Sequence, residues 1–189
     1  MSGFVRRVVT GHDAQGRSIV IADGIAPAEH HNPMVAGQRS SDVWKTTAMP
    51  VPITREEPDP TTGKRDFVAP MGTKIRFSEV PPETPELFKL TPQQTRDMFR
   101  NSGSQIKSTY KEGGRHPRIH RTESLDYAVV LEGEITMVLD VGEVHLKTGD
   151  VVIQRGTNHA WSNRSGKTVR MLYILIDGRF DPELAAQFE

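Results

Sequence analysis

The feature that most constrains this fold is a run of short segments between Ser104 and Asp177, rich in Val and Ile and separated by glycine-containing turns. Six such segments lie about 8–12 residues apart with no helical pattern between them, which is typical of an antiparallel sandwich or barrel rather than a βαβ sheet. The sequence therefore predicts an all-β fold for this region. The segments are Tyr127–Glu132, Ile135–Asp140, Glu143–Leu146, Val151–Gln154, Ala160–Asn163 and Val169–Ile176.

The first eighty residues contain shorter strand-like runs interrupted by turn residues. Phe4–Val9 and Ser18–Ala22 flank a turn and predict a hairpin, while Asp42–Thr47 and Lys74–Val80 predict two further strands. Residues 24–40 show no period, so they are expected to form a loop.

Helical signals are confined to two places. Thr91 is a candidate N-cap followed by Pro92 and by Gln94 in the capping-box position, so residues 81–103 are expected to hold a short surface helix or lid. Asp181 and Pro182 predict a short C-terminal helix. We expect one structural domain. Residues 1–103 would pack on the barrel or on a dimer partner, residues 104–178 would form the barrel, and residues 179–189 would form the tail.

Composition excludes several classes of function. Lys and Arg (24) balance Asp and Glu (24), so the chain has no net charge to attract nucleic acid or an anionic membrane surface. The absence of cysteine excludes disulfides, thiolate metal sites and cysteine nucleophiles. No apolar run approaches the roughly 18–20 residues needed to span a bilayer, and no signal peptide is evident. We therefore expect a cytoplasmic protein that binds a small molecule.

Two groups of polar residues with even spacing fall on the predicted strands. His120, Thr122 and Asp126 share one face of a regular strand, and His159 shares a face with Trp161. Two imidazoles and one carboxylate inside a barrel can form a metal site or an acid–base pair.

Glycines frame these residues in two recognisable patterns. The first runs from Gly114 through His120 to Gly133, and the second runs Gly149-x4-Gln154-x-Gly156-x2-His159-x3-Asn163. Together they resemble the two motifs of the cupin superfamily, with Gln154 where proline usually stands. The resemblance covers roughly residues 104–178. It implies a double-stranded β-helix, or jelly-roll, barrel with extra N-terminal strands and short flanking helices.

The resemblance also implies a metal site in altered form. Cupin metal sites use three histidines and one glutamate, whereas here Thr122 stands at the second histidine and Asp126 at the glutamate. The implied ligands are His120, Asp126 and His159, which suit Fe, Mn, Zn or Ni. A barrel that works without metal is the alternative.

Other residues could complete or surround this site. Glu123 could turn inward at a bulge, His116 could approach from the preceding loop, and a partner subunit could supply His30 or His31. Thr122, Trp161, Asn163 and Arg155 are the expected substrate-binding residues.

Two hypotheses for function follow. The first is an enzyme in which His159 and Asp126 act as acid and base in lyase, isomerase, dehydratase or decarboxylase chemistry, with or without a metal. Metal-dependent dioxygenation is a less favoured variant. The second is a non-catalytic small-ligand-binding or structural cupin with a relict metal site. A homodimer is expected in both cases, because the N-terminal strands can cover an exposed sheet edge of a neighbour.

Overall fold

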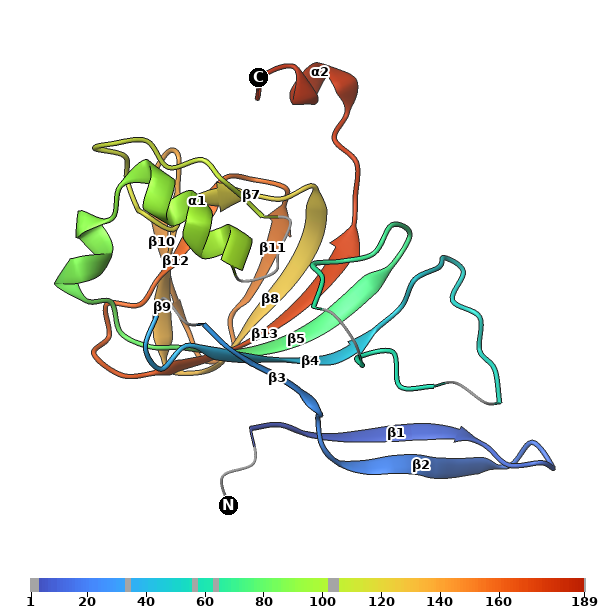
Figure 1. The fold of residues 1–189 in the computed structure, drawn as a ribbon. Coiled ribbons are helices and arrows are strands. Elements are labelled where there is room, and N and C mark those ends of the chain that lie inside the picture. The colour runs from blue at the N-terminus through green and yellow to red at the C-terminus, as the bar shows by residue number, and fades with distance from the viewer. Residues whose placement is uncertain (1–3, 33–34, 56–57, 63–64, 102–105, 189) are drawn as a thin grey trace.

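A computed structural model describes residues 4–32, 35–55, 58–62, 65–101 and 106–188. Two antiparallel sheets face each other and enclose the interior, and a separate hairpin extends away from them (Figure 1). The chain is mostly β with a few short helices, as the sequence predicted. None of the helices within the described ranges combines the length and the apolar character needed to cross a bilayer.

The larger sheet has six strands in the order β11-β8-β13-β5-β4-β3. Its strands come from both halves of the chain: β3 (Ala28–His31), β4 (Arg39–Lys45), β5 (Thr73–Val80), β8 (Ser124–Glu132), β11 (Val151–Arg155) and β13 (Val169–Asp177). Strand β5 lies between β13 and β4 and pairs with both in antiparallel register. The N-terminal half is therefore built into the barrel sheet.

The smaller sheet has five strands in the order β10-β9-β12-β7-β6. They are β6 (Lys107–Ser108), β7 (His120–Arg121), β9 (Glu134–Leu139), β10 (Glu143–Lys147) and β12 (His159–Ser162). Tight turns join its longer strands to the larger sheet. Gly133, between β8 and β9, and Gly149, between β10 and β11, have positive φ angles of 87° and 93°, which favour glycine because it has no Cβ.

The core lies between the two sheets. Strand β8 alternates buried and half-buried residues along Ser124–Val130, so its inward face carries Asp126, Ala128 and Val130. Ala128 and Val130 belong to one apolar cluster, against which Trp161 and Tyr173 pack. That cluster is Val80, Ala128, Val130, Ile135, Met137, Leu146, Val169 and Met171.

Helix α1 (Pro92–Asn101) follows a short 3-10 helix, η1 (Pro85–Lys89), and lies beside β7 at the barrel opening (Figure 1). The predicted capping box is confirmed. The Thr91 N–H donates to Gln94 Oε1 at 2.8 Å, and the Gln94 N–H donates to Thr91 Oγ1 at 3.2 Å. The predicted C-terminal helix is also present as α2 (Pro182–Ala185), capped by the Asp181 side chain.

The N-terminal hairpin, β1 (Arg6–His12) with β2 (Ser18–Ile25), confirms the predicted strand pair. The expectation of a loop over residues 24–40 is wrong in part, because Ala28–His31 forms strand β3 and pairs with β4. Strand β4 has an open edge, and this edge gives the short segment backbone hydrogen-bond partners that its own sequence does not predict.

Candidate functional site

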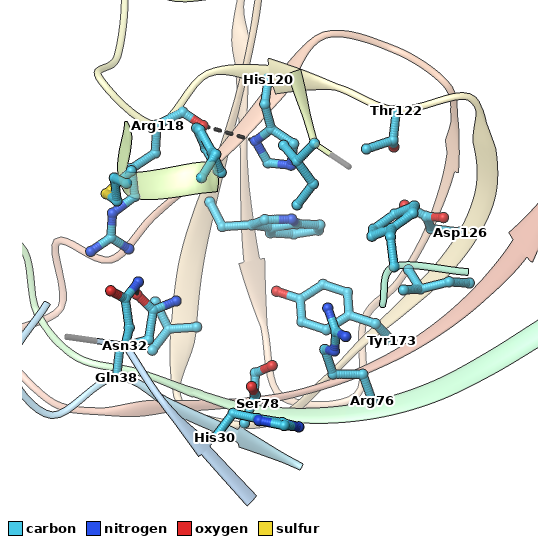
Figure 2. Close-up of a pocket in the computed structure, with 18 of the residues that line it drawn as sticks. His30, Asn32, Gln38, Arg76, Ser78, Arg118, His120, Thr122, Asp126 and Tyr173 are labelled. Carbon is cyan, nitrogen blue, oxygen red and sulfur yellow. Dashed lines mark hydrogen bonds between the residues drawn. The ribbon is translucent and has the colours of Figure 1, made fainter. Parts of the chain in front are cut away.

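A cavity of about 180 Å³ lies between the two sheets, and helix α1 contributes to its wall. Figure 2 shows His120 and Thr122 at one end of it and His30 and Ser78 at the opposite end, with Tyr173 between them. Its lining residues come from seven strands, helix α1 and five loop segments. They are His30, Asn32, Gln38, Arg39, Ser40, Arg65, Phe67, Arg76, Ser78, Val80, Met98, Phe99, Ile106, Arg118, His120, Thr122, Asp126, His159, Trp161, Tyr173 and Leu175.

A row of five rings forms one wall of this cavity. Strands β7 and β12 pair His120 directly with His159, so the two imidazole centroids are 4.4 Å apart. Phe99 of α1 packs on His120 at 5.0 Å, Trp161 packs on His159 at 5.8 Å, and Tyr173 packs on Trp161 at 5.6 Å. Successive rings are tilted or edge-on to one another, at angles from 47° to 81°, so the wall offers separate ring faces and edges to an aromatic or conjugated ligand.

Both imidazoles are held through Nδ1. The His120 Nδ1–H donates to the Arg118 carbonyl oxygen at 2.8 Å. His159 Nδ1 lies 3.0 Å from the Thr157 carbonyl oxygen and 2.9 Å from Nε2 of Gln154, which itself donates to that carbonyl. Nε2 of each ring is therefore the nitrogen that remains for a ligand.

Burial keeps both imidazoles neutral. It lowers the pKa of His159 to about 4, and burial together with the neighbouring His159 lowers the pKa of His120 to about 3. Near neutral pH the pair therefore offers hydrogen-bonding nitrogens but no positive charge.

Asp126 is the only carboxylate among the residues that line the cavity. It lies on β8 and is 6% exposed, and its Oδ1 has no hydrogen-bond partner among the described residues. Burial raises the pKa of this carboxyl to about 6, against the opposing influence of Ser124 and Arg76. Burial, reinforced by the charge of Asp126, also raises the pKa of Tyr173, so the phenol keeps its proton. A base and a hydrogen-bond donor thus share one cavity.

Four arginines, Arg39, Arg65, Arg76 and Arg118, also line the cavity, together with the half-buried His30. Arg118 lies beside His120, which donates to its carbonyl oxygen, whereas Arg76 lies below Asp126 near Tyr173 (Figure 2). Burial, with Arg65 nearby, lowers the pKa of His30, so this histidine is neutral as well. Figure 2 shows the Arg118 side chain directed toward Asn32 and Gln38.

The match to known proteins agrees with this architecture. Residues 107–175 match the family model described as a cupin domain. The cupin-domain-containing oxidoreductase fogC of Aspergillus ruber is 30% identical over 178 residues, which cover 92% of this chain and 72% of that protein. The chain belongs to the cupin superfamily.

Two further similarities extend along most of this cupin. Phomopsin biosynthesis cluster protein D of Diaporthe leptostromiformis is 35% identical over 184 residues, which cover 92% of this chain and 78% of that protein. Among solved structures, the Schizosaccharomyces pombe Cnp3 cupin domain aligns with 97% of this chain and 93% of its own, at 11% identity and a TM-score of 0.43.

The metal ligands implied for this cupin are not assembled into one site. Within the described residues, no three His, Asp or Glu side chains converge where they could hold a metal ion. His120 and His159 meet, but Asp126 stands apart from them below Thr122, with one oxygen unpartnered (Figure 2). These residues do not fit the expected three-ligand set.

The structure separates the predicted substrate-binding residues into two pairs. Thr122 and Trp161 line the cavity, as expected. Asn163 does not: its side chain is fully buried and donates to the Val80 and Lys167 carbonyl oxygens, where it fastens the turn after β12. Arg155 is exposed at the end of β11 and also lies outside the cavity lining.

The residues considered as substitutes have other partners. His116 is buried against Glu83, with Nε2 2.7 Å from Oε1. Glu123 accepts a hydrogen bond from the Phe180 N–H at 2.8 Å, away from the imidazoles. His30 does enter the cavity, but it does so from β3 of the same chain, while His31 is exposed beside Glu29.

The arginines of the cavity were missed at the level of sequence. Lys74, Arg76 and Ser78 alternate with Ile75 and Phe77 along β5, and in the structure this polar face is buried. The alternation separates the two faces of the strand but does not say which face is covered, and in the structure Asp42 of β4 pairs with both buried cations. No comparable pattern marks Arg65 or Arg118.

Proposed function

We propose that this cupin is an enzyme of small-molecule biosynthesis that moves a proton on a carbonyl compound bound in the barrel cavity. The observation that carries this proposal is Asp126, a buried carboxyl with an unpartnered oxygen and a pKa of about 6. A group with that pKa is mostly ionised at pH 7 to 8 and still basic enough to take a proton from substrate.

The neighbouring groups supply the rest of a proton-transfer site. Asp126 takes a proton from the carbon beside the carbonyl, and the electron pair moves onto the carbonyl oxygen. The Tyr173 phenol, which keeps its proton, donates a hydrogen bond to that oxygen as its charge grows. Return of the proton from Asp126 to another atom completes an isomerisation, and loss of a neighbouring group completes an elimination.

The imidazoles have a positioning role in this scheme. The expectation that His159 serves as the acid is replaced, because an imidazole with a pKa of about 4 carries almost no proton to give near pH 7. His120 and His159 instead present fixed Nε2 atoms and the faces of two tilted rings to the substrate.

The similarity to fungal proteins supports a biosynthetic setting. One relative is named as a phomopsin biosynthesis cluster protein, and another is named as an oxidoreductase. The second name favours a second candidate function, oxidation or reduction of a small molecule in the same cavity. In both cases the protein acts on a ligand that enters the barrel.

Hydrogen–deuterium exchange tests the proposal. The protein is incubated with 4-oxo-4-phenylbutanoate in deuterated buffer, and exchange beside the ketone is followed by NMR. We expect catalysed exchange whose rate rises through about pH 6, its loss in Asp126→Asn and a reduced rate in Tyr173→Phe. Arg155→Gln, outside the cavity, should leave the rate unchanged. Equal exchange in the wild type and in Asp126→Asn would contradict the role of Asp126, and oxygen or cofactor consumption without exchange would favour the redox alternative.

A further inference from the structure

The charge of the cavity differs sharply from the charge of the whole protein. The chain has a formal net charge of zero, yet four arginines and one aspartate line the cavity. The three histidines in the lining add no charge near neutral pH, because burial lowers the pKa of each. A cavity lined in this way carries an excess of positive charge, which favours an anionic ligand.

Two of the four arginines are already neutralised by acidic partners. Arg76 makes a bidentate pair with Asp42, with distances of 2.7 and 3.2 Å. Arg39 contacts Glu79 at 2.6 Å and Glu29 at 3.5 Å. These two side chains therefore have little capacity left for a ligand.

The other two arginines have no acidic partner within ion-pair distance among the described residues. Arg65 donates one hydrogen bond, to Ser40 Oγ at 2.9 Å, and its Nε is buried without an acceptor. Arg118 also has a buried Nε without an acceptor. Two buried guanidinium groups with unused donors are costly unless something in the cavity accepts from them.

We propose that Arg118 and Arg65 bind a carboxylate of the substrate, so that this cupin acts on organic acids with an aromatic or conjugated body. The inference rests on the proposed function for its choice of cavity. A planar carboxylate matches the hydrogen-bonding fork of a guanidinium. With the carboxylate on these guanidinium groups, the rest of the molecule contacts the row of rings that lines the same cavity.

Calorimetric titration of the intact protein with benzoate and with benzamide tests the inference. The two probes have nearly the same shape but differ by a full negative charge. We expect benzoate to bind at least tenfold more tightly than benzamide, and we expect this preference to fall below twofold in Arg118→Gln. Arg65→Gln should reduce it in part. The exposed Arg17→Gln is the matched control and should keep the full preference.

Several outcomes overturn the carboxylate site. Equal binding of the two probes would do so, as would a full preference for benzoate in a folded Arg118→Gln, or no binding of benzoate at 10 mM. Thermal melts of each variant show whether it is folded. Should Arg118→Gln fail to fold, the Arg65→Gln titration decides: an unchanged preference overturns the site, and a reduced preference supports it.

The test separates this inference from the proposed function. Asp126→Asn should abolish exchange on 4-oxo-4-phenylbutanoate while keeping the benzoate preference. A wild-type protein that prefers benzoate but catalyses no exchange refutes the proton-transfer proposal alone. A wild-type protein that catalyses exchange but binds both probes equally refutes the carboxylate site alone.

Discussion

Replacement of Asp126 by asparagine should remove the catalytic base and also make the folded protein more stable in a way that depends on pH. The carboxyl has a pKa of about 6 in the fold and an ordinary value of 3.8. The folded state therefore binds this proton more tightly than the unfolded chain does, and the contribution of Asp126 to the free energy of unfolding falls as pH rises from about 4 to 6. Above pH 6 the loss amounts to about 3 kcal/mol, at 1.36 kcal/mol for each pH unit between the two values.

The asparagine variant carries no such penalty. Its amide leaves an unpaired polar atom in the cavity, and the cost of this atom is the same at every pH. This cost therefore cancels when the free energy of unfolding is compared between two pH values. Urea unfolding gives the free energy of unfolding of Asp126→Asn and of the wild type. The value for the variant minus the value for the wild type should be about 3 kcal/mol larger at pH 8 than at pH 4. The exposed Glu112→Gln serves as a control for removal of a carboxyl. A difference that is the same at both pH values would refute the assignment of a buried, ionised Asp126.

Three further results are expected. His120 and His159, whose pKa values fall to about 3 and 4, bind protons more weakly when folded and act in the opposite direction to Asp126, so their contribution to stability is full above pH 6.5 and several kcal/mol of it are lost as pH falls toward 4; unfolding curves of Asp126→Asn, in which Asp126 no longer titrates, that do not change between pH 7 and pH 4 would contradict this. His116→Ala should cost about 1.5–3 kcal/mol in denaturant titrations, because Oε1 of the buried Glu83 loses its hydrogen-bond partner while Ser162 still donates to Oε2, and a cost below 1 kcal/mol would show that water reaches Glu83. We also predict a homodimer in which the β1–β2 hairpin packs on a second copy, since an isolated two-stranded hairpin with exposed Val and Ile side chains is marginally stable; light scattering that gives the monomer mass of 21.1 kDa would end that prediction.

The barrel half of the fold was predictable because its signals are local. Regular strand lengths, turn glycines such as Gly133 and Gly149, and the capping box at Thr91 each constrain the backbone within a few residues. The pairing of His120 with His159 was also predictable, since each lies in a motif position on its own strand.

The contribution of the N-terminal half depends on contacts that no short segment encodes. Ala28–His31 becomes a strand only because β4 offers it an edge, and this pairing carries His30 into the cavity. The burial of Arg76 depends on Asp42 from another strand. Asn163 is a related case. It stands at the expected motif position, but its amide donates to two backbone carbonyl oxygens and so does not reach the cavity.

The cavity is assembled from two parts of the chain that the family boundary separates. The segment that matches the cupin family begins at residue 107, and it supplies the strand-borne rings of the row, Asp126 and Arg118. Strands β3, β4 and β5 and the Arg65 segment come from earlier in the chain and supply His30 and three of the four cavity arginines. Substitutions before residue 81 can therefore change the charge of the cavity while Asp126 and Arg118 stay in place. For the same reason, a fragment cut at residue 107 would keep Asp126 but lose the strands that carry His30, Arg39 and Arg76.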